Sequence, residues 1–157
     1  MKVALVKKKM EIQPIFARHE TFHPRFGWLK KGFDKAVENN TVFSEESAPS
    51  TLGVGKNMVK AIRYWSLAYK ILQEDPKKNN RTLIPTYFGK QLLESEGWDP
   101  YLEDTASLWL LHWNLLKGHC QATAWYYAFN IFNRYVFTSD DILSGLIEYK
   151  DREFQLS

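Results

Sequence analysis

The chain has 157 residues, 25% of them charged, with a formal net charge of +3 at pH 7. This length suits one domain or a compact pair of subdomains with a hydrophobic core. No apolar run approaches the roughly 20 residues of a membrane span, and the basic N-terminus lacks the apolar core of a signal peptide. The one cysteine, Cys120, has no disulfide partner in the chain. These features predict a cytoplasmic protein, in which a nucleic-acid interface would require locally clustered cations.

The first half of the chain is expected to begin with a strand or extended arm over residues 1–16. Apolar spacing over residues 27–38 predicts a helix. Ser44, followed by two glutamates, is a candidate N-cap for a short second helix. Pro49 fits only the first turn of that helix, and Gly53 would end it.

The clearest helical pattern spans residues 56–69. At about 100° per residue, four apolar side chains fall on one face: Met58, Ile62, Trp65 and Tyr69. Lys56, Lys60 and Arg63 project from nearly the opposite side. This amphipathic pattern is typical of a helix that packs on a protein core and presents cations to phosphate. The alternative is an ordinary solvated helix face, because lysine and arginine are good helix formers.

A basic hairpin is predicted directly after this helix. Two β-prone runs, residues 71–73 and 81–84, flank a loop that is rich in proline, asparagine and charge. The loop carries Lys77 and Lys78, and Arg81 follows it. A basic helix followed by a basic hairpin is the order found in winged-helix modules, where both elements grip the duplex.

Four more helices are predicted in the second half. Thr86 would cap a helix over residues 87–95, and Asp104 would cap a helix over residues 105–116. A third helix is expected over residues 122–135. Thr138 with Asp141 resembles a capping box for the fourth, which would end near residue 152. The second and third are apolar nearly all round, which favours burial at a domain centre or a subunit interface. We therefore predict a mainly α fold with a small β-hairpin. A winged-helix-like helix-turn-helix domain would cover residues 1–97, and an aromatic-rich helical subdomain would cover residues 98–157.

Two short motifs resemble catalytic sites, and both are incomplete. Residues 19–23 match HExxH, the zinc-protease pattern. However, Pro24 follows His23 at once and disfavours helix there, so zinc binding by His19 and His23 is the least favoured alternative. Residues 50–57 resemble a P-loop without its first glycine and without the hydroxyl that binds Mg²⁺. We expect no catalytic residue, metal or cofactor.

Several sequence blocks resemble a known family. They are FARHETF at residues 16–22, RFGWLKK at 25–31, LGVGKNMV at 52–59, IRYW at 62–65, GWDPYLED at 97–104 and LWLLHW at 108–113. Together they resemble the bacterial family catalogued as domain of unknown function number four thousand and seven. The resemblance implies genes beside phosphoadenosine-phosphosulfate-reductase-like proteins and ATPases, in clusters like those for phosphorothioate DNA modification and phage defence. It also implies that members continue beyond residue 157.

The function expected from the residues and this resemblance is a non-catalytic subunit that binds double-stranded DNA. Its partners would be the reductase-like or ATPase proteins, and a homodimer is a further option. The residues expected to contact DNA are Lys56, Asn57, Lys60, Arg63, Lys77, Lys78 and Arg81. The main alternative is a protein–protein interaction module that recruits a partner enzyme through the aromatic helices.

Overall fold

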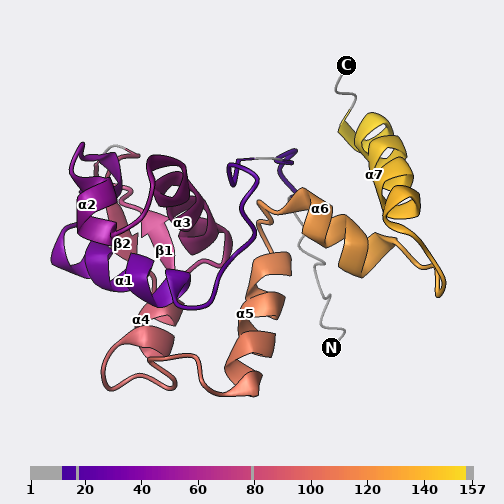
Figure 1. Ribbon diagram of the computed structural model, residues 1–157. Helices are drawn as coiled ribbons and strands as arrows, with labels where there is room; N and C mark the ends of the chain where they lie inside the picture. Colours follow the sequence, from indigo (N-terminus) through magenta and orange to yellow (C-terminus); the bar gives the residue numbers. More distant parts are fainter. Residues whose placement is uncertain (1–11, 17, 79, 155–157) are drawn as a thin grey trace, which may run out of the picture. The chain divides into compact units, whose positions relative to one another are not determined.

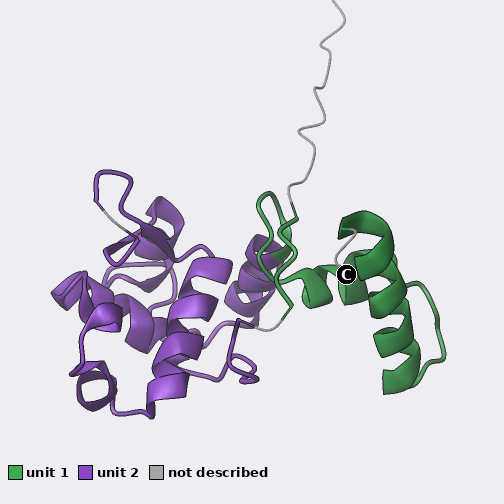
Figure 2. Ribbon diagram, turned by 90° about the horizontal axis from the view of Figure 1, so that it is seen from above, with its two compact units in different colours: residues 1–16, 116–157 green, residues 17–115 purple. Residues whose placement is uncertain are grey.

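The computed structural model describes residues 12–16, 18–78 and 80–154, which form seven α-helices and one two-stranded antiparallel sheet (Figure 1). The expected mainly helical fold with a small hairpin is confirmed at this level. The chain divides into a compact unit of residues 17–115 and a second made from residues 1–16 and 116–157 (Figure 2). The sequence-based division after residue 97 stays a prediction. Most of the expected N-terminal arm, residues 1–11, lies outside the described residues.

The unit of residues 17–115 begins with three helices and a 3₁₀ turn: α1 (Trp28–Glu38), η1 (Val42–Ser44), α2 (Ala48–Leu52) and α3 (Lys56–Ala68). The predicted helices at 27–38 and 56–69 match α1 and α3 within one residue. Gly53 ends α2 in the left-handed region, at φ 62°, which glycine adopts without steric cost.

Ser44 is not the N-cap of α2, contrary to the sequence-based expectation. It ends η1, and α2 begins four residues later at Ala48. The Glu45 carboxylate accepts hydrogen bonds from the Asn39 amide, 2.7 Å away, and the Thr41 hydroxyl, 2.9 Å away. The Ser44 hydroxyl donates to the Arg81 carbonyl oxygen over 3.3 Å instead of capping α2.

Helix α3 supplies the centre of the core. Ile62 and Trp65 are fully buried and Tyr69 is nearly so, whereas Met58 is half-buried. The Trp65 indole N–H donates to the carbonyl oxygen of Phe22 over 2.9 Å, which satisfies the polar group of a large buried ring. Burial also raises the pKa of Tyr69 to about 12. The predicted apolar face of this helix is therefore confirmed.

The hairpin consists of β1 (Leu72–Glu74) and β2 (Leu83–Pro85), with Gln73 opposite Ile84. On its other side, Leu83 N–H donates to the Asn40 carbonyl over 2.8 Å. The hairpin is thereby attached to the segment between α1 and α2. Figure 1 shows it beside α3 in the same unit.

Helices α4 (Tyr87–Leu93) and α5 (Thr105–Leu116) follow the hairpin. Thr86 caps α4 by accepting the Gly89 N–H at 2.9 Å, and Asp104 accepts the Ala106 N–H at 2.8 Å at the start of α5. Both predicted caps are confirmed. The expected burial of α5 on all sides is not observed within this chain, because Trp109 and Trp113 are each 68% exposed.

The second unit contains α6 (Thr123–Tyr126), a π-helical turn η2 (Tyr127–Ile131) and α7 (Ser139–Phe154). The predicted helix over residues 122–135 therefore ends early, at Ile131. The capping box is confirmed, because Asp141 accepts the Thr138 N–H at 2.8 Å and Thr138 accepts the Asp141 N–H at 3.3 Å. None of the described helices has the length and apolar character needed to cross a membrane.

Candidate nucleic-acid interface

The N-terminal end of α3 is built to favour an anion. Gly55 provides no capping side chain, and the first turn contains no acidic residue. The first N–H groups of a helix lack intrahelical partners and carry partial positive charge. Lys56 and Asn57 occupy this turn with exposed side chains. A cation here opposes the helix dipole, so this end of α3 is suited to accept an anion such as phosphate.

Arg63 joins α3 to the hairpin. Its guanidinium donates to the Asn80 carbonyl oxygen at 2.8 Å and to the Glu74 carboxylate at 3.0 Å. Glu74 ends β1, and Asn80 lies in the loop that leads to β2. The predicted cationic helix and the predicted basic hairpin are therefore in direct contact at Arg63.

Lys60 lies one turn before Arg63 and also has an acidic partner. Its ammonium is 3.1 Å from the Glu20 carboxylate, with the two side chains 54% and 34% exposed. An exposed ion pair of this kind contributes little free energy, about 0–1 kcal/mol. Lys60 can therefore exchange its carboxylate for another anion at small cost.

The hairpin loop supplies the remaining predicted cations. Asp75 organises the turn, because its carboxylate accepts the Lys77 N–H at 2.9 Å and its carbonyl accepts the Lys78 N–H at 3.1 Å. Both lysine side chains are exposed, as is Arg81. Within the described part of the chain, neither Lys77 nor Lys78 has an acidic partner for its ammonium group.

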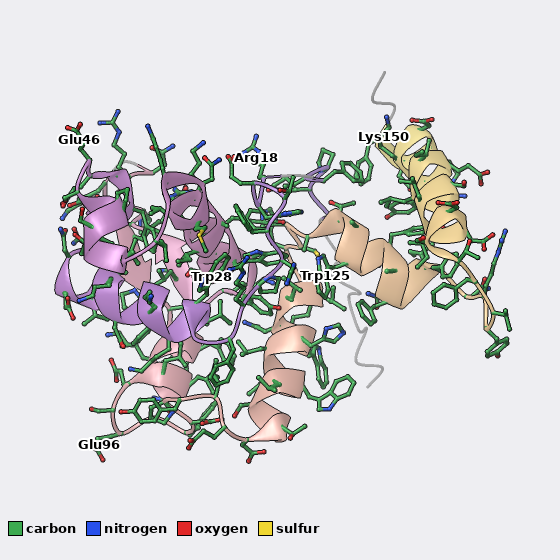
Figure 3. The ribbon with its side chains drawn as sticks, viewed as in Figure 1. Arg18, Trp28, Glu46, Glu96, Trp125 and Lys150 are labelled. Atoms are coloured by element: carbon green, nitrogen blue, oxygen red, sulfur yellow. The ribbon has the colours of Figure 1, made fainter. Side chains whose placement is uncertain are left out.

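A groove of about 280 Å³ lies beside Lys60 and Arg63 of α3. Its lining consists of Arg18, Glu20, Phe43, Lys60, Arg63 and Tyr64. Sequence reasoning missed Arg18, which precedes α3 by nearly forty residues and follows no periodic pattern. In Figure 3 the Arg18 side chain points outward at the edge of the unit where α3 lies, and Glu96 lies at the opposite edge.

The two histidines of the HExxH match have different environments. The His19 ring stacks on Trp65, with centroids 5.5 Å apart and planes at 21°, whereas His23 is exposed. Residues 19–22 form a turn, closed by a hydrogen bond from Phe22 N–H to the His19 carbonyl, instead of the helix that a zinc protease needs. Among the residues that the structure describes, no three His, Cys, Asp or Glu side chains form a group that could hold a metal.

Comparisons with known proteins give a family and two similar structures. The family model described as "Protein of unknown function (DUF4007)" matches residues 16–156. Two crystal structures of SspB, one of them magnesium ion-bound, are each 41% identical to this chain, with TM-scores of 0.85 and 0.84. The matches cover 92% of this chain but only 44% and 45% of those chains, so this chain spans less than half their length. No match was found among curated proteins.

Proposed function

We propose that this chain, which belongs to the DUF4007 family, is a non-catalytic, DNA-binding subunit of a bacterial DNA-modification or phage-defence system. The observation that carries the proposal is the contact of Arg63 with the hairpin, because it joins α3 directly to the hairpin whose loop carries Lys77 and Lys78. Double-stranded DNA offers regularly spaced phosphates that such a surface can neutralise.

The order of elements supports a winged-helix-like mode of binding. In this proposal α2 and α3 form the helix-turn-helix, α3 is the recognition helix, and the loop between β1 and β2 is the wing. The uncapped N-terminus of α3, with Lys56 and Asn57, would face the DNA groove or the DNA phosphates. Reductase-like or ATPase proteins would supply the chemistry.

The direct test is the double variant Lys60→Ala with Arg63→Ala. Removing two phosphate contacts should weaken duplex binding about tenfold or more at low salt and make the slope of log K against log salt shallower by about two. Gel shift or fluorescence anisotropy gives the affinity, and far-UV circular dichroism checks the fold.

A matched control removes the same amount of charge elsewhere in the unit. Lys35→Ala with Lys90→Ala changes α1 and α4 and leaves α3 and the hairpin intact. If both double variants lose affinity equally, net charge alone drives binding and the proposed surface is wrong.

A protein-interaction module is the second candidate, favoured by α5. Trp109 and Trp113, four residues apart on that helix, are both exposed, and exposed tryptophan pairs are typical of interface hot spots. Trp109→Ala with Trp113→Ala should abolish co-purification with a partner protein encoded by a neighbouring gene while leaving DNA affinity unchanged. Loss of DNA affinity, with co-purification retained, would assign this face to nucleic acid instead.

A further inference from the structure

One of the side chains that line the groove beside α3 is itself an anion, the carboxylate of Glu20. Three cationic side chains line it, Arg18, Lys60 and Arg63, and Glu20 is the acidic residue among its described lining. The Glu20 carboxylate lies 3.1 Å from the Lys60 ammonium. A carboxylate and a phosphodiester are both oxygen anions that bind lysine through charge-assisted hydrogen bonds, so they compete for the same position.

The backbone that presents Glu20 adopts an unfavourable conformation. Glu20 and Thr21 have φ values of 51° and 64°, and two successive non-glycine residues in this left-handed region are rare. The turn is held in place by its neighbours, because the Phe22 carbonyl accepts the Trp65 indole N–H and the His19 ring stacks on Trp65. Such conformations persist only where the surrounding structure enforces them, and they cluster at ligand sites and switches.

We infer that Glu20 is an internal competitor for phosphate, which pairs with Lys60 in the free protein and is displaced when DNA binds. This inference rests on the proposed function and adds a regulation to it. The pair is exposed enough for exchange, and a ligand must provide several phosphates at once to outweigh the local carboxylate. Isolated anions would therefore be disfavoured relative to a DNA backbone.

The test is Glu20→Gln, which keeps the side-chain shape and removes the charge. Affinity for a fluorescent DNA duplex should rise about two- to fivefold at low salt, and the gain should shrink as salt screens the exposed pair. Glu96→Gln is the matched control, because it changes the net charge equally at the opposite edge of the unit (Figure 3). An equal rise in both variants would overturn the inference.

A double-mutant cycle with Lys60→Ala tests whether Glu20 acts through Lys60. The gain from Glu20→Gln should be clearly smaller in the Lys60→Ala background, because the competing pair is already absent. If Lys60→Ala weakens binding but Glu20→Gln has no effect, the competitor role is wrong and the DNA surface stands. If neither substitution changes affinity, the DNA surface is wrong and the competitor role is rejected with it.

Discussion

Raising monovalent salt from about 50 to about 200 mM should weaken duplex DNA binding by roughly 10³-fold. The physical reason is that binding releases counterions from DNA. The number released, and with it the salt dependence of the affinity, rises with the number of phosphates that the protein neutralises. The proposed surface carries six cations: Lys56, Lys60, Arg63, Lys77, Lys78 and Arg81. Six phosphate contacts give a slope of log K against log salt of about −5.

The slope is informative because it counts contacts without requiring a known sequence preference. Fluorescence anisotropy titrations at five or more salt concentrations measure it. A slope near −2 would mean that most of these cations do not meet phosphate. Pairing of Lys60 with Glu20 and of Arg63 with Glu74 would remove only two of the six contacts, which gives a slope of about −3.5.

The sequence predicts α3 and the hairpin well because both are encoded locally. Apolar side chains at helical spacing fix the buried face of α3, and the cations then fall on the exposed face. The caps at Thr86, Asp104 and Thr138 are also local, since each involves a backbone N–H two or three residues away. Pattern reasoning recovers interactions of this range.

Contacts between distant segments were not predictable in the same way. Glu20 and Lys60 are 40 residues apart, and the turn that presents Glu20 uses left-handed backbone at residues other than glycine. Neither property leaves a periodic signal. Ser44 shows the related problem that a good candidate cap makes a distant contact instead, because its hydroxyl donates to the Arg81 carbonyl oxygen over 3.3 Å. The residues that line the groove are therefore identified by the structure and not by the sequence pattern.

Adding a single methyl group at Gly89 should destabilise the fold by about 2–4 kcal/mol. Gly89 lies in the first turn of α4, which packs directly on the backbone of Ile71. An added Cβ would overlap the Ile71 carbonyl oxygen and lie 2.9 Å from the carbonyl carbon. That oxygen also accepts the Thr86 N–H over 3.0 Å, so it cannot move without breaking the bond between Ile71, just before β1, and the N-cap of α4.

Thermal unfolding of Gly89→Ala should therefore show a Tm lower by about 5–15 °C. Gly55→Ala is the matched control, because its φ of −68° suits alanine and the nearest atom to an added Cβ is the Met58 sulfur at 4.0 Å. We expect that control to change stability by less than about 1 kcal/mol, since a weaker helix cap offsets a less flexible unfolded chain. Equal Tm values for Gly89→Ala and the wild type would mean that α4 can move away from Ile71. The hairpin begins at Leu72, the residue after Ile71. In that case it would not be fixed firmly enough to present its loop cations beside α3.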